Sequence, residues 1–136
     1  TKGSAQSGTG KTEKLTVGAT PVPHAELLNL VKDDLKKEGI ELEIVEFNDY
    51  VQPNKALADK SLDANFFQHV PYMEDFGKKN NIELSAVGNI HLEPMALYSK
   101  KIKNVNDLKN GDTLLIPNVL TNGGRALFLL DKAEII

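Results

Sequence analysis

The sequence contains no cysteine and no tryptophan. Without cysteine, a disulfide framework and a thiolate metal site are both excluded within this sequence. No apolar run approaches the roughly 18 residues that a membrane helix requires. A formal net charge of -3, with 26% charged residues, gives no basic surface for nucleic acid. The 136 residues suffice for one domain and a fragment of a second.

The first twelve residues, T-K-G-S-A-Q-S-G-T-G-K-T, contain no aliphatic side chain larger than that of Ala5. This composition predicts a flexible tether over residues 1–12. The end of the segment is similar to a phosphate-binding P-loop, but Ala5 stands where that motif requires glycine, and the residues that follow favour a strand rather than a helix. We therefore do not interpret it as a nucleotide site.

From residue 15 onward the pattern is that of an α/β fold. A short β-rich run, 15–19, ends at a turn with two prolines. Apolar residues at helical spacing then predict a helix from about Pro23 to Gly39, and alternating residues predict a second strand over 42–47. This β-α-β order implies a parallel sheet with a right-handed crossover.

Further elements are expected along the rest of the chain. They are a helix over 54–59, a strand over 62–67, a helix over 71–80, an extended segment over 82–99, a helical turn over 104–109, a strand over 113–116 and a closing helix over 121–133.

The segment Asp63 to Tyr72, D-A-N-F-F-Q-H-V-P-Y, combines flat apolar rings with polar tips. Gln68, His69 and Tyr72 need hydrogen-bond partners, so packing entirely inside a core would leave polar groups to satisfy. Such a mixture suits a small-molecule pocket, although an aromatic strand end packed on its own domain remains the alternative. Ligand chemistry in α/β folds is expected at the carboxyl ends of strands, and the segments 20–24, 48–54, 66–72 and 118–125 all follow predicted strands.

A second candidate region is the loop from Pro117 to Arg125, P-N-V-L-T-N-G-G-R. Small residues at a helix start let backbone N–H groups approach a ligand, and the helix dipole adds partial positive charge. Arg125, expected in the first helical turn, can pair with a carboxylate through two parallel hydrogen bonds. A surface salt bridge is the alternative role for this side chain.

Four stretches together resemble the methionine-binding lipoproteins of bacterial ABC importers. They are A-T-P-V-P-H-A-E-L-L at 19–28, F-N-D-Y-V-Q-P-N-K-A-L-A-D at 47–59, D-A-N-F-F-Q-H-V-P-Y at 63–72, and I-P-N with T-N-G-G-R-A-L within 116–127. The resemblance implies a substrate-binding protein with two α/β lobes that close on an amino acid, anchored outside the cytoplasmic membrane by a lipidated cysteine that this sequence does not contain. It implies methionine or a related compound as ligand, and the transporter membrane subunit as partner.

The resemblance also assigns candidate ligand-binding residues. Phe67, His69 and Tyr72, with Phe66 adjacent, would surround the thioether side chain. Arg125 would take the α-carboxylate, with Asn122 or Asn118 adding polar contacts. His91 is a weaker candidate on the segment that leads to the second lobe. Asn48 and Tyr50 would close the rim of the first lobe.

Two departures from the family pattern stand out: Val119-Leu120 replaces Asp-Pro, and Glu134 replaces a glycine that normally ends the helix. Family members are also longer by roughly a hundred residues. We therefore expect a tether at 1–12, an incomplete first lobe at 13–86, and a hinge with a partial second lobe at 87–136. Apolar faces left without partners would favour a homodimer formed by exchange of the C-terminal part.

An enzyme that uses His24, His69 and His91 is the contrasting hypothesis. No two histidines have the spacing of a helical metal motif, and no G-x-S-x-G nucleophile elbow is present. We therefore expect a binding protein without a catalytic site, metal or cofactor. A truncated homologue that self-associates and binds little or no ligand is a further alternative.

Overall fold

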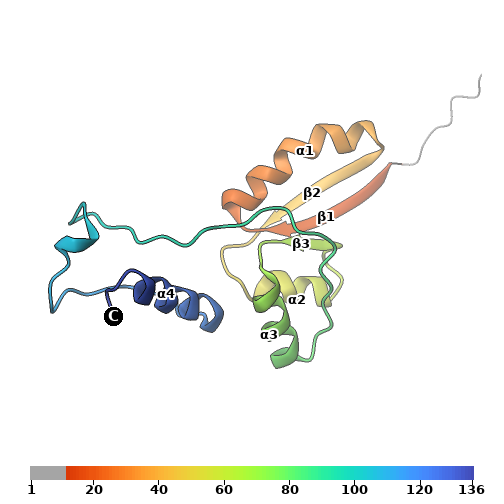
Figure 1. The fold of residues 1–136 in the computed structure, drawn as a ribbon. Coiled ribbons are helices and arrows are strands. Elements are labelled where there is room, and N and C mark those ends of the chain that lie inside the picture. The colour runs from red at the N-terminus through yellow and green to blue at the C-terminus, as the bar shows by residue number, and fades with distance from the viewer. Residues whose placement is uncertain (1–11) are drawn as a thin grey trace, which may run out of the picture. The chain divides into compact units, whose positions relative to one another are not determined.

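The computed structural model describes residues 12–136 (Figure 1). The chain divides into two compact units, the first ending at Leu84 and the second running over Ser85–Ile136. The predicted tether and the P-loop-like motif lie outside the described residues, except for Thr12.

A parallel sheet forms the centre of the first unit. Its strands are β1 (Glu13–Ala19), β2 (Ile40–Glu46) and β3 (Ala64–Phe66), in the order β2-β1-β3. β1 pairs with β2 along its whole length, whereas β3 pairs only through its three residues. The predicted α/β class with a parallel sheet is confirmed, while the third strand is shorter than expected.

Helices lie on both sides of this sheet, with α1 on one side and α2 and α3 on the other (Figure 1). A short helical turn η1 (Pro21–Ala25) leads into α1 (Glu26–Lys37), and α2 (Gln52–Ala58) and α3 (Val70–Asn80) follow. The expected stop of the first helix is present at Gly39, whose φ of +84° is readily adopted only by glycine.

The core of the first unit is small. Its buried apolar side chains include Val17, Leu42, Leu62, Phe67 and Phe76. Gly18 leaves room for this packing, because a Cβ atom there would lie 2.5 Å from Leu62 Cδ1 and 2.9 Å from a ring carbon of Phe47. A side chain at position 18 would therefore force the core apart.

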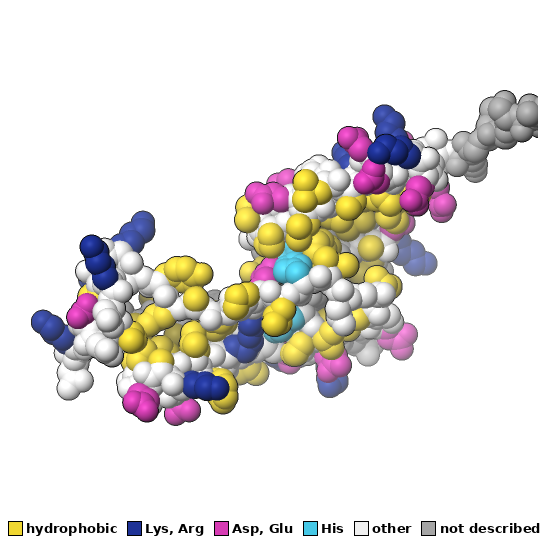
Figure 2. Space-filling model, turned by 45° about the horizontal axis from the view of Figure 1, so that its top comes forward, with side chains coloured by type: hydrophobic (Ala, Val, Ile, Leu, Met, Phe, Trp, Pro, Cys, Tyr) yellow, Lys and Arg dark blue, Asp and Glu magenta, His cyan; other side chains and the backbone are white. Residues whose placement is uncertain are grey.

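The second unit contains the helical turn η2 (Val105–Asp107) and the helix α4 (Leu120–Lys132). The strand predicted over 113–116 is wrong, since these residues are not hydrogen-bonded to another strand within the described chain. An extended segment becomes a strand only when a neighbouring strand satisfies its backbone groups. Hydrophobic side chains are exposed on the surface of this unit around α4 (Figure 2). Val87 and Leu115 are 98% and 95% exposed.

None of the helices within residues 12–136 has the length and apolar character needed to cross a membrane.

Candidate ligand-binding site

The three parallel strands of the first unit end at one edge of the sheet, at Ala19, Glu46 and Phe66. A shallow hollow lies at this edge, between the start of η1 and the segment that follows β2. It is lined by Thr20, Pro21, Phe47, Asn48, Asp49 and Tyr50. The predicted position of a binding rim, at the carboxyl ends of the strands, therefore coincides with a hollow in the first unit.

Four aromatic rings pack together beside this rim. Phe67 is buried and stacks on Tyr50 with ring centroids 6.0 Å apart, and it meets Tyr72 edge-on at 6.1 Å. Tyr72 also contacts Tyr50 at 6.1 Å and Phe76 at 5.9 Å. Sequence reasoning placed Phe67 and Tyr72 together but gave Tyr50 only a secondary role. Tyr50 is 47% exposed and so presents a ring surface to solvent.

The hydroxyl of Tyr72 is engaged within the cluster. It donates a hydrogen bond of 2.7 Å to the backbone carbonyl of Tyr50. Burial raises the pKa of the Tyr72 phenol, and the charges of Asp49 and Asp75 and the neighbouring Tyr50 add to the shift. The phenol therefore stays protonated at neutral pH and holds the two segments of the cluster together.

Phe66 and His69 lie on either side of Phe67 along the chain. Phe66 ends β3 and meets the ring of His24 edge-on at 4.7 Å. His24 is buried and shares a 2.7 Å hydrogen bond with the Thr20 hydroxyl through Nδ1. His69 precedes α3, and its backbone carbonyl accepts hydrogen bonds from Tyr72 and Met73. Both residues thus help to fix the backbone around Phe67.

Arg125 is the main polar candidate for ligand binding in the second unit. Its guanidinium donates to the Asn122 side-chain oxygen at 3.3 Å and to the backbone carbonyl of Glu93 at 3.0 Å. The structure corrects one expectation: α4 begins at Leu120, so Arg125 lies in the second turn rather than the first. Repulsion between its charge and the helix dipole is correspondingly weaker, because that effect fades beyond the first turn.

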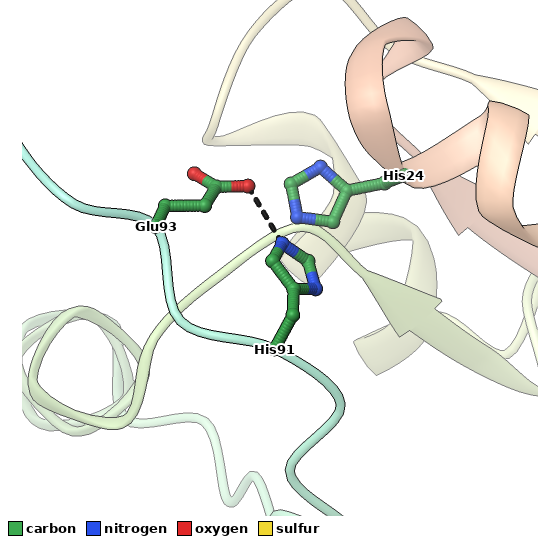
Figure 3. Close-up of side chains that lie close together, drawn as sticks. All are labelled: His24, His91 and Glu93. Carbon is green, nitrogen blue, oxygen red and sulfur yellow. Dashed lines mark hydrogen bonds and ion pairs between the residues drawn. The ribbon is translucent and has the colours of Figure 1, made fainter.

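The side chains of His91 and Glu93 lie within hydrogen-bonding distance of each other on the segment before η2 (Figure 3). His91 Nε2 lies 2.8 Å from the carboxylate of Glu93. His24, also drawn there, belongs to the first unit. Sequence reasoning named His91 but missed Glu93, whose carbonyl accepts from Arg125 while its carboxylate pairs with His91. Asn118 is exposed in the loop that precedes α4.

The start of α4 has no side-chain cap among the described residues, and the residue before it is Val119. A Cβ atom at Gly123 would lie 3.0 Å from the carbonyl oxygen of Pro117, whereas one at Gly124 would meet open space. The buried hydroxyl oxygen of Thr121 has no hydrogen-bond partner within residues 12–136. These features suit an approaching anion.

Comparison with known proteins decides the family. The model of the NlpA lipoprotein family matches residues 15–136, nearly the whole chain. This chain belongs to the NlpA lipoprotein family. The resemblance drawn from the sequence motifs is therefore confirmed.

Individual relatives carry more specific names. The methionine-binding lipoprotein MetQ of Bacillus subtilis is 44% identical over 128 residues, which cover 93% of this chain and 46% of that protein. A nutrient binding protein from Burkholderia cenocepacia, solved bound to methionine, is 40% identical with a TM-score of 0.85, over 90% of this chain and 51% of that one. A periplasmic substrate-binding protein of an ABC transporter from Coxiella burnetii is 39% identical with a TM-score of 0.85, over 90% and 53%.

The NlpA family chain described here spans about half the length of the curated relatives it matches. The relatives are named as binding proteins and lipoproteins rather than as enzymes, in agreement with the expectation of a non-catalytic chain.

Proposed function

We propose that this chain takes part in capturing methionine, or a closely related amino acid or short peptide, as part of a substrate-binding lipoprotein of an ABC importer. The observation that supports this most strongly is the aromatic cluster of Tyr50, Phe67 and Tyr72 at the carboxyl edge of a parallel sheet. It occurs in a family with a relative named for methionine binding and a structural neighbour solved with methionine. In this proposal a lipid anchors the protein outside the cytoplasmic membrane, and the transporter membrane subunit is its partner.

The aromatic cluster suits the thioether side chain. A methionine sulfur against the edge of a ring gains about 0.3 to 1.5 kcal/mol, so several rings are needed before sulfur is distinguished from a methylene group. The exposed ring of Tyr50 offers the accessible surface, and the buried ring of Phe67 supports it from behind. Phe66 and His69 keep the proposed role of flanking residues.

Arg125 suits the α-carboxylate of the ligand. A guanidinium has five N–H donors, and the hydrogen bonds within the described residues engage NH1 and NH2 of Arg125 once each. A carboxylate could therefore add to these bonds or replace the long contact with Asn122. Backbone donors at the start of α4 would add to the attraction, with Asn118 and Asn122 supplying neutral polar contacts. His91, paired with Glu93, keeps a supporting role.

A thermal-shift panel tests this proposal. L-methionine should stabilise the chain, norleucine should do so less because it lacks the sulfur, and methioninamide least because it lacks the carboxylate. Arg125→Ala should weaken L-methionine binding by about 1.5 to 3 kcal/mol through loss of a charge-assisted pair. Lys132→Ala is the matched control, since it removes a cation from the far end of the same helix. Equal responses of the two variants would place the carboxylate elsewhere.

A second candidate function is self-association with little or no ligand binding. The exposed apolar side chains of the second unit favour it, among them Leu115, Leu127 and Phe128, which are 95%, 48% and 67% exposed. Large exposed apolar patches mark sites of association in many proteins. Sedimentation velocity over a wide concentration range tests it: a dimer indifferent to methionine would favour this alternative, and a monomer of 14.9 kDa would exclude it.

A further inference from the structure

Three side-chain amides form a hydrogen-bonded cluster behind the aromatic rings of the first unit. Asn54, in the first turn of α2, is completely buried and exchanges two hydrogen bonds with Gln68. Its Nδ2 donates to Gln68 Oε1 at 2.9 Å, and its Oδ1 accepts from Gln68 Nε2 at 2.8 Å. Asn65 on β3 donates to the same Asn54 oxygen at 2.9 Å and to the backbone carbonyl of Pro53 at 3.2 Å.

Burying this carboxamide cluster (Asn54, Asn65 and Gln68) costs desolvation free energy that apolar side chains would not cost. Burying an amide without a partner costs several times the net gain of one hydrogen bond, so each member depends on the geometry of the others. Gln68 Nε2 also approaches Asn65 Oδ1 at 3.2 Å. A network satisfied in this way specifies one arrangement of the segments that carry it, which leucines of similar volume would not do.

The segments joined by the cluster are those that carry the aromatic rings. Tyr50 lies just before α2 and therefore close in sequence to Asn54, while Phe67 is the immediate neighbour of Gln68. A second tie between these segments is the hydrogen bond from the Tyr72 hydroxyl to the Tyr50 carbonyl. The stacked Tyr50 and Phe67 rings, 6.0 Å apart, thus lie on two segments fastened at two points.

We propose that the carboxamide cluster is a positioning device that fixes the separation of the Tyr50 and Phe67 segments, and through it the width of the surface offered to an apolar ligand side chain. Gln68 is its key member, because it carries the reciprocal pair to Asn54 and sits next to Phe67. The identity of the ligand rests on the proposed function, whereas the ring geometry does not.

The first test compares Gln68→Ala with Leu62→Ala in the full chain. Gln68 is half-buried, so its removal should leave the fold intact, and Leu62 is a buried core residue outside the cluster. Both variants should unfold at lower temperature than the parent. Only Gln68→Ala should lose the nuclear Overhauser contacts between the Tyr50 and Phe67 rings. Only Gln68→Ala should also weaken L-methionine binding, by about tenfold, because the hydrogen bonds of the Gln68 side chain to Asn54 and Asn65 are lost.

A second variant, Gln68→Glu, keeps the shape of the side chain. As a carboxylate it presents oxygen instead of N–H to the Asn54 and Asn65 oxygens, which removes both donors. Once protonated, the introduced carboxyl group can again donate to Asn54. The ring contacts, and the ratio of variant to parent affinity, should therefore recover as the pH falls from 7.5 to about 4, the range in which a glutamate carboxyl becomes protonated. Leu62→Ala should show no such recovery.

The outcomes separate this proposal from the proposed function. Unchanged ring contacts in both Gln68 variants would overturn the positioning role, whatever the affinity. Lost ring contacts in a chain whose parent form does not bind methionine would uphold the positioning role and refute the proposed function. Equal losses of ring contacts in Gln68→Ala and Leu62→Ala would reduce the cluster to ordinary core packing and overturn the proposal.

Discussion

Replacing Tyr72 with phenylalanine isolates the role of a single hydroxyl group in the aromatic cluster. The change removes the 2.7 Å hydrogen bond to the Tyr50 carbonyl and leaves the ring contacts with Phe67 and Phe76 in place. Because the hydroxyl already donates within the protein, we expect the ring rather than the hydroxyl to serve a ligand. Tyr72→Phe should therefore leave L-methionine affinity within about twofold of the parent value, because no hydrogen bond to the ligand is lost and the carboxamide cluster still joins the Tyr50 and Phe67 segments.

Tyr72→Phe should lower the free energy of unfolding only modestly. A neutral hydrogen bond contributes about 0.5 to 1.5 kcal/mol net, and the unpaired carbonyl here lies near the surface, where water can bind it. We expect the free energy of unfolding to fall by about 0.5 to 1 kcal/mol at pH 7, with no cavity term since the ring volume is retained.

The stability difference between parent and Tyr72→Phe can also be checked by its dependence on alkaline pH. Burial raises the pKa of the Tyr72 phenol above its ordinary value of 10.0. The folded state then holds this proton more tightly than the unfolded state, so the contribution to stability is complete below pH 10 and declines as the pH rises through the folded pKa. The phenylalanine variant has no such group, so the difference between parent and variant should shrink between pH 9 and pH 11.

Urea unfolding of parent and variant at pH 7, 9 and 11, with calorimetric titration at pH 7, measures these quantities. A destabilisation above about 2 kcal/mol at pH 7 would exceed a lost hydrogen bond and would refute this assignment. A stability difference between parent and variant that grows with pH would refute the expected direction of the pH effect. A large loss of affinity would refute the expectation that binding does not depend on this hydroxyl group.

The remaining predictions concern the backbone at Gly123, Gly124 and Glu134, and each is checked by thermal unfolding. Gly124→Ala meets open space within a helix and should stabilise the chain by about 0.5 to 1 kcal/mol, whereas Gly123→Ala presses on the Pro117 carbonyl and should destabilise it. If a carboxylate approaches the start of α4, Gly124→Ala should also weaken its binding. Glu134 has a φ of +56°, so Glu134→Gly should raise stability by up to about 1 kcal/mol; a loss of stability would mean that its side chain contributes more than the backbone strain costs.

Local patterns predicted the first unit well because its elements are determined mainly by short-range signals. The alternation of apolar and acidic residues identified β2, and the helical spacing from Leu27 to Leu35 identified α1. The left-handed conformation of Gly39 ended that helix where expected. Thr113 to Ile116 has the composition of a strand, but composition does not supply the neighbouring strand that it needs.

The candidate site was only partly predictable for the same reason. Side-chain types indicated Phe67 and Tyr72, and polar groups in an apolar segment indicated that Gln68 needs a partner. The partner, Asn54, lies 14 residues earlier in the chain, and no local pattern connects the two. Glu93, 32 residues before Arg125, was likewise missed because contacts of this range follow from the fold rather than from spacing.

Isothermal titration of the chain with L-methionine at neutral pH tests the central claim most directly. The proposal predicts a saturable heat of binding with one site per chain, which is sharply reduced in Arg125→Ala and preserved in Lys132→Ala. Absence of any binding heat at millimolar methionine, in a chain shown to be folded, would contradict it.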